Sequence, residues 1–145
     1  MTVDDILRSF ALAPLLRGLS SSLFWLCAAL AFVGLFFPAR PLPRDLAGVL
    51  WFVCAPFLEE FTWRTLLQGE LNSFFPGSRL LGAPNIFASA GFAAAHTIFA
   101  PGLLSVLTFF PSLIFGCIWT KFHSTWLCGL LHLWYNFVFR AFQFP

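Results

Sequence analysis

The chain of 145 residues is 59% hydrophobic and only 10% charged, with a mean hydropathy of +0.85. Because soluble domains carry about 25% charged residues, this composition excludes an ordinary water-soluble fold and indicates an integral membrane protein. The net charge of +2 is small and the basic residues are scattered, so nucleic acid is not expected as a partner. We expect an all-α fold, a polytopic transmembrane helical bundle of about five spans that forms one domain over residues 1–145.

The N-terminal part is predicted to contain a short interfacial segment and then the first span. Residues 1–17 mix apolar and charged side chains in the manner of a short amphipathic helix. No charge occurs between Arg17 and Arg40, and residues 19–37 can cross about 30 Å of hydrocarbon.

The second span is predicted over residues 46–67. Pro56 lies inside it and is expected to kink the helix, because proline removes a backbone hydrogen bond. Residues 68–84, which contain Pro76-Gly77-Ser78, are expected to form the longest connection, at the membrane interface or in water.

Three further spans are predicted over residues 85–100, 103–120 and 125–142. The first of these is rich in alanine and glycine, and such small residues allow helices to pack closely in a membrane. Pro101-Gly102 and residues 121–124 separate the three spans.

Polar side chains capable of chemistry occur on three of the predicted spans. The second carries Glu59, Glu60 and Arg64, the third carries His96, and the fifth carries His132 and Asn136. An ionised group at the centre of a membrane helix costs roughly 2.5–3.5 kcal/mol, so such residues indicate a functional site. At 1.5 Å per residue, Glu59, His96 and His132 lie about 12–15 Å from helix ends that share one side of the membrane. Their side chains can therefore meet at one depth.

The spacing of these residues suggests two kinds of chemistry. Glu60 and Arg64 lie four residues apart and form a natural ion pair. Glu59 is rotated by about 100° from Glu60, so it can face the histidines and, with an imidazole, activate a water molecule. The pair His132 and Asn136 shares a helix face and can donate hydrogen bonds to an oxyanion. No serine lies in a GxSxG pattern, which favours direct attack by water.

Three patterns together resemble one protein family. Glu59-Glu60-x-x-x-Arg64, Phe92-x-x-x-His96 and His132-x-x-x-Asn136 occur in this order within a catalytic core over residues 46–140. They resemble the CPBP family, also called CAAX protease and bacteriocin-processing or ABI proteins. Members of that family are glutamic-type intramembrane proteases, and they include the Ras-converting prenyl-protein endopeptidase.

The resemblance implies a role for each matching residue. Glu59 matches the catalytic glutamate, and His96 matches the histidine that helps it activate water. The pair His132 and Asn136 matches the residues that stabilise the oxyanion. Supporting positions are matched by Glu60, Arg64 and Phe92. Many relatives have additional spans, and small members that resemble this chain are thought to process C-terminal sorting tails in bacteria.

Other interpretations remain open. The residue types of Glu59, His96 and His132 suit a catalytic zinc ion, although an HExxH motif is absent and the resembling family acts without metal. A non-catalytic immunity or scaffold protein is a second alternative. A proton-coupled carrier is a third, disfavoured by the absence of an inverted repeat.

The predicted function is therefore an intramembrane endopeptidase of a bacterial cytoplasmic membrane. Its partners are the lipid bilayer and a membrane-anchored or tail-bearing protein substrate, with either a C-terminal sorting tail or a CAAX-like terminus. No cofactor and no metal are expected, and the sequence does not indicate an oligomeric state.

Overall fold

The computed structural model describes residues 2–37, 41–75 and 79–141, and every regular element in these ranges is a helix. The elements are α1 Val3–Ser9, α2 Leu12–Leu19, α3 Ser22–Leu30, the 3₁₀ helix η1 Ala31–Phe36, α4 Leu46–Glu60, the π-helix η2 Phe61–Gln68, α5 Gly69–Phe74, α6 Ala83–Phe99, α7 Leu103–Leu107, α8 Phe109–Phe122 and α9 Thr125–Ala141. The all-α prediction is confirmed for the described part of the chain.

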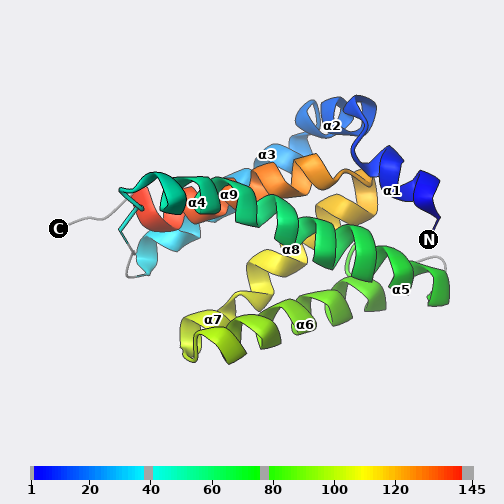
Figure 1. Cartoon of the computed structure of the whole chain (residues 1–145). Coiled ribbons are helices and arrows are strands. Elements are labelled where there is room, and N and C mark those ends of the chain that lie inside the picture. The colour runs from blue at the N-terminus through cyan, green and yellow to red at the C-terminus, as the bar shows by residue number, and fades with distance from the viewer. Residues whose placement is uncertain (1, 38–40, 76–78, 142–145) are drawn as a thin grey trace.

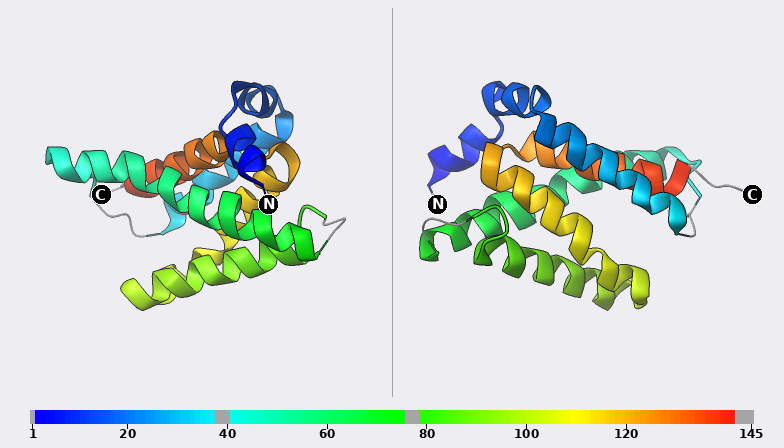
Figure 2. Two further views of the ribbon diagram at one scale, coloured as in Figure 1. Left: turned by 45° about the vertical axis from the view of Figure 1, so that its right-hand side comes forward. Right: turned by 180° about the vertical axis from the view of Figure 1, so that it is seen from behind.

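Helices α4 and α9 lie side by side (Figure 1). The N-terminal helices cover one edge, where α3 runs along α9, and α6 lies at the opposite edge (Figure 2). Helix α8 crosses between these edges and contacts both α6 and α9. The π-helix η2, which continues α4, contacts α6, α8 and α9.

The N-terminal segment differs from the prediction at the boundary of the first span. The predicted lead forms two helices, and the second of them extends to Leu19. The chain then bends by 72° before the helical segment Ser22–Phe36. Ser21 stabilises the new start because its side chain accepts a hydrogen bond of 3.3 Å from the backbone N–H of Leu23. The uninterrupted span predicted over residues 19–37 is therefore wrong at its beginning.

The second predicted span is longer than expected. The helix runs from Leu46 to Phe74 and continues through Pro56, whereas the prediction ended it at residue 67. Polar residues from Gln68 onward suggested a connection, but Gln68 is fully buried and hydrogen-bonded within the bundle. The wider π-helical turns begin directly after the two acids, and such turns occur frequently at functional sites. Pro76-Gly77-Ser78 lies outside the described residues.

The number of membrane spans stays a prediction. Among the described residues, the helices Leu46–Phe74 and Leu103–Phe122 are long and apolar enough to cross a membrane, and the bent pair α2 and α3–η1 gives a third if it counts as one span. Helices α6 and α9 have 17 residues each, at the lower limit for a span of about 17–25 residues. Phe142, where the fifth span was predicted to end, is outside the described residues.

Helix α9 is held from two sides. A Cβ atom on Gly129 would lie 2.2 Å from Cδ1 of Phe57, so this glycine allows α9 to approach α4 closely. On the other side, the indole N–H of Trp134 donates to the carbonyl of Ala28 at 2.9 Å. The hydroxyl of Tyr135 donates to the carbonyl of Cys27 at 2.8 Å. These contacts fix the register of α9, which carries two of the predicted site residues.

Candidate active site

The two adjacent glutamates at the end of α4 lie in different environments. The side chain of Glu60 is completely buried, whereas that of Glu59 is 34% exposed. Consecutive helical residues point about 100° apart, so one acid faces the interior of the bundle and the other faces an opening. The two acids therefore have different surroundings, as their spacing predicted, while their roles stay a prediction.

Glu60 joins Arg64 to His132. Its Oε2 atom accepts a hydrogen bond of 3.1 Å from Nε of Arg64, which is the ion pair predicted from the sequence. Its Oε1 atom accepts a hydrogen bond of 2.9 Å from Nδ1 of His132 on α9. This second contact was not predicted from the sequence. A signal for it existed, because a buried histidine that works through Nε2 needs an acceptor for its Nδ1–H.

The guanidinium of Arg64 is fully buried and surrounded by acceptors from three helices. Besides Glu60, it donates to Gln68 Oε1 at 3.0 Å and Ser89 Oγ at 3.4 Å, and it also donates to Ser112 Oγ. Together these four contacts satisfy a group that would otherwise be very costly to bury. The spacing of Gln68, four residues after Arg64, was the available signal for its presence in this cluster.

Glu59 faces the two histidines. Its Oε2 atom lies 3.9 Å from Nε2 of His96 and 3.9 Å from Nε2 of His132. Both separations are too long for a direct hydrogen bond. This oxygen is buried and has no hydrogen-bond partner among the described residues. An orphaned, buried carboxylate oxygen between two imidazoles leaves a position suited to a bridging molecule.

The hydrogen bonds of the two histidines determine which ring nitrogen faces Glu59. Nδ1 of His96 lies 3.0 Å from the carbonyl oxygen of Phe92, which can only accept, so Nδ1 carries the proton. Nδ1 of His132 likewise donates to the carboxylate of Glu60. In both neutral rings, Nε2 therefore presents a lone pair toward Glu59.

Aromatic rings hold these imidazoles in place. The ring of Phe92 lies 4.2 Å from that of His96 and 5.8 Å from that of His132, measured between centroids. Phe115 stacks on His132 from α8 at 4.9 Å. The packing position predicted for Phe92 is thus beside both histidines.

Asn136 is the predicted site residue that the structure does not connect to the others. It lies on α9 one turn after His132 and is half-buried. Its side chain makes no hydrogen bond to any residue that the structure describes. The other predicted residues, Glu59, Glu60, Arg64, Phe92, His96 and His132, lie together.

The cluster contains residue types that bind zinc, but its geometry does not fit a metal site. Across residues 2–37, 41–75 and 79–141, no group of three or more His, Cys, Asp or Glu side chains is arranged to hold a metal ion. Glu59 Oε2 and the two Nε2 atoms are farther apart than the ligands of a tetrahedral zinc ion with bonds of about 2.0–2.2 Å.

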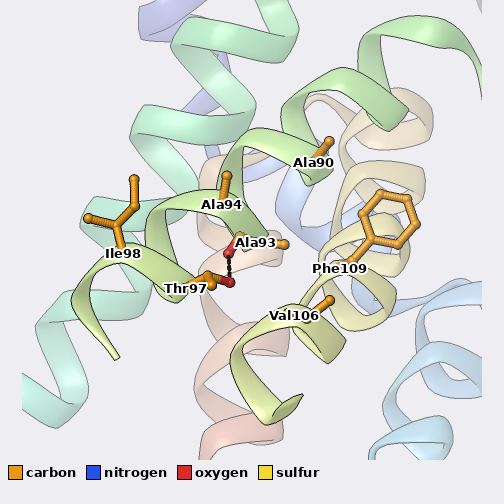
Figure 3. Close-up of a pocket in the computed structure, with 7 residues that line it drawn as sticks. All are labelled: Ala90, Ala93, Ala94, Thr97, Ile98, Val106 and Phe109. Atoms are coloured by element: carbon orange, nitrogen blue, oxygen red, sulfur yellow. Dashed lines mark hydrogen bonds between the residues drawn. The ribbon is translucent and has the colours of Figure 1, made fainter. Parts of the chain in front are cut away.

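An open apolar groove lies between α6, α7 and the start of α8, and none of the predicted site residues lines it. It has a volume of about 470 Å³ and is lined by Ala90, Ala93, Ala94, Thr97, Ile98, Val106 and Phe109 (Figure 3). Thr97 directly follows His96, and its hydroxyl donates to the carbonyl of Ala93, so it exposes no free donor along the groove wall. The small side chains of α6 therefore form an apolar surface next to the histidine.

Comparison with known proteins identifies the family of the chain. Residues 41–138 match the family described as "Type II CAAX prenyl endopeptidase Rce1-like". The matched range covers more than half of the chain and contains all seven predicted site residues. No curated protein and no solved structure matches the chain significantly. The family is membrane-embedded and implies a peptidase, in agreement with the apolar helices.

Proposed function

Because the chain belongs to the Rce1-like family of type II CAAX prenyl endopeptidases, we propose that it is an intramembrane endopeptidase that uses water activated by Glu59. One observation carries the proposal: the buried Oε2 atom of Glu59 has no partner among the described residues and lies 3.9 Å from Nε2 of both His96 and His132. The mechanism is metal-independent and of the glutamic type.

The attacking water binds between Glu59 and His96. A water oxygen about 2.8 Å from both Oε2 and Nε2 would form an angle of roughly 90° between them, which is acceptable for hydrogen bonding. The Nδ1–H of His96 is held by the carbonyl of Phe92, so Nε2 can accept a proton from this water. Both water protons then have an acceptor while a lone pair points at the substrate carbonyl.

The reaction follows from these positions. The water oxygen bonds to the carbonyl carbon as one water proton moves to Oε2 of Glu59, and the carbonyl oxygen becomes an oxyanion. The C–N bond then breaks as Glu59 returns this proton to the leaving amine. The overall reaction consumes one water molecule and leaves the enzyme unchanged.

His132 and Asn136 stabilise the oxyanion. To donate through Nε2, His132 must carry protons on both nitrogens, and its Nδ1–H is then held by the Glu60 carboxylate at 2.9 Å. The amide of Asn136 supplies the second donor, because it is free of hydrogen bonds to the described residues. Donors of this kind are strong in a site of low dielectric constant.

The substrate enters from the exposed side of the site. Glu59 and His96 are about one third exposed, whereas His132 is only 7% exposed, so the peptide approaches over α6. The apolar groove on α6 receives the hydrophobic part of the substrate. A prenylated CAAX-like terminus is the first substrate class to test, given the family, and a C-terminal sorting tail is the second. We place the enzyme in a bacterial cytoplasmic membrane.

The decisive experiment is cleavage of a fluorogenic, farnesylated CAAX peptide in proteoliposomes. Wild type is expected to cleave it, whereas Glu59→Gln and His132→Ala are expected to lose activity while remaining folded. Asp4→Asn, which removes one exposed carboxylate on α1, is the control and should match wild type. Full activity of Glu59→Gln would overturn the glutamate mechanism. Equal function of all variants in cells would instead favour a scaffold role.

A zinc-dependent mechanism at the same residues is the chemical alternative that the residue types of Glu59, His96 and His132 leave open, although their separations do not fit a zinc site. Exhaustive chelation followed by elemental analysis separates the two mechanisms. Activity that survives with no bound metal supports the proposal. Activity that is lost on chelation and restored by zinc alone supports the alternative.

A further inference from the structure

Gln68 lies behind the candidate active site but belongs to none of the three motifs. It ends the π-helix η2, and its side chain is completely buried. Its Oε1 atom accepts a hydrogen bond of 3.0 Å from Nη1 of Arg64. Gln68, Arg64, Glu60 and His132 therefore form a continuous chain of hydrogen bonds that ends at the imidazole facing Glu59.

The amide of Gln68 has only one orientation that satisfies its neighbours. Its Nε2 atom lies 3.1 Å from the carbonyl oxygen of Gly116, which can only accept. The same nitrogen donates to Oγ1 of Thr120 at 3.0 Å. With the nitrogen fixed toward α8, the oxygen must face Arg64. Helix α8 thus sets the direction of the amide.

The amide of Gln68 holds one of the two terminal nitrogens of the Arg64 guanidinium. This nitrogen, Nη1, donates a short hydrogen bond to Gln68 and a longer one of 3.4 Å to Ser89. Nε is held by Glu60, and Nη2 by Ser112. A planar guanidinium held at all three nitrogens has a fixed position, and it then fixes the carboxylate that it contacts.

We propose that Gln68 is a positioning residue of the active site: by anchoring Arg64 to α8, it fixes the Glu60 carboxylate that directs Nε2 of His132 toward Glu59. The inference rests on the proposed function, because it assigns Gln68 a role in the same reaction. Gln68 touches no reacting atom and acts only through Arg64, Glu60 and His132.

Gln68→Met tests the proposal with little disturbance of packing or of other hydrogen bonds. Methionine has a similar size, and the carbonyl of Gly116 keeps a donor because Thr120 also donates to it at 2.9 Å. The substitution therefore acts mainly on Arg64. We expect kcat for the farnesylated peptide to fall by about 10–100-fold, as for other outer partners that orient a histidine, with KM nearly unchanged.

Ile118→Val is the matched control for packing. Ile118 is completely buried on the same helix as Gly116 and Thr120, and its apolar side chain cannot take part in the hydrogen bonds of the Arg64 cluster. It should lower the melting temperature while kcat stays near the wild-type value. A folded Gln68→Met protein with wild-type kcat and KM would overturn the proposal.

Gln68→Glu provides a pH-dependent readout that a purely structural role would not produce. A protonated carboxyl group can accept from Arg64 and donate to the Gly116 carbonyl, so it imitates the amide. Once ionised, it competes with Glu60 for Arg64 and faces the carbonyl oxygen. For Gln68→Glu we expect kcat to be near the wild-type value at low pH and to fall as pH rises. The wild-type enzyme should not show this decrease in kcat. Identical pH profiles would overturn the proposal, even if Gln68→Met does not fold.

A spectroscopic measurement separates this inference from the proposed function. If Glu59→Gln cleaves the peptide as well as wild type, the proposed mechanism fails, but the orientation of His132 can still be tested. The ¹⁵N NMR signals of the imidazoles, assigned with His132→Gln and His96→Gln, should show a changed Nδ1–H signal for His132 and an unchanged one for His96 in Gln68→Met. An unchanged His132 signal would overturn the inference.

Discussion

Nδ1 of His132 donates a hydrogen bond of 2.9 Å to Oε1 of Glu60, although 72 residues separate the two in the chain. The second acid of the Glu59-Glu60 pair is therefore shared between Arg64 and the histidine. It orients the site, whereas Glu59 is left without a hydrogen-bond partner among the described residues. This asymmetry leads to different predictions for the two acids.

Glu60→Gln should destabilise the protein far more than Glu59→Gln. Removal of the Glu60 charge leaves the buried guanidinium of Arg64 without its counter-charge, and breaking a buried pair costs about 3–5 kcal/mol. Glu59→Gln removes a charge whose buried oxygen has no partner, so stability should be unchanged or slightly higher. Thermal unfolding in detergent measures both. Equal destabilisation by the two substitutions would contradict this division.

Asn136→Ala should impair catalysis without affecting stability. The side chain makes no hydrogen bond to the described residues, so its loss should change the free energy of unfolding by less than about 0.5 kcal/mol. Loss of one oxyanion donor should lower kcat by about 10²–10³-fold. Asn136→Asp keeps the shape but cannot donate, so it should be equally impaired. An active Asn136→Asp enzyme would exclude the donor role.

Gly129→Ala should separate α9 from α4 and displace His132. The new Cβ atom would lie 2.2 Å from Cδ1 of Phe57, and such overpacking costs typically about 1–3 kcal/mol. Gly91→Ala is the matched control, because its Cβ atom would meet only the far end of the Trp63 ring, at 2.9 Å. Both melting temperature and kcat should fall clearly for Gly129→Ala and much less for Gly91→Ala. Comparable effects would show that the α4–α9 contact is not critical.

His123 should make stability depend on pH. This residue lies in the left-handed region (φ 50°) just after α8 and is exposed, but partial desolvation of its ring, which packs against Trp119, lowers its pKa below the usual 6.5. The unfolded chain therefore binds the proton more readily, and stability falls as pH drops below 6.5 toward the folded-state pKa. His123→Asn tolerates the same backbone conformation without titrating, so it should reduce the decrease in melting temperature between pH 7.5 and 5. An unreduced decrease would assign the effect to other groups.

The convergence of Glu59, His96 and His132 could be predicted because it depends on simple quantities. Helix rise and alternating direction place these residues at one depth, and the rotation between neighbouring residues separates Glu59 from Glu60. These rules hold in a helical bundle regardless of which helices are neighbours. The structure accordingly brings the three residues together.

The helix ends and the polar cluster could not be predicted in the same way. Gln68 was expected at the end of a span because polarity usually marks an interface, but its amide finds acceptors on α8 that only the tertiary fold provides. The π-helical turns after Glu60 and the bend before Ser22 likewise depend on local hydrogen bonding. Composition along the chain contains no signal for either.

The hydrogen bonds from α9 to α3 indicate how much of the chain is needed for a stable fold. The family match begins at residue 41, yet the polar tips of Trp134 and Tyr135 are satisfied only by carbonyls of Ala28 and Cys27. Without the N-terminal helices, these donors would face hydrocarbon, where each unsatisfied group costs several kcal/mol. The matched segment contains the candidate site residues, whereas a stably folded unit also requires the helices that precede residue 41.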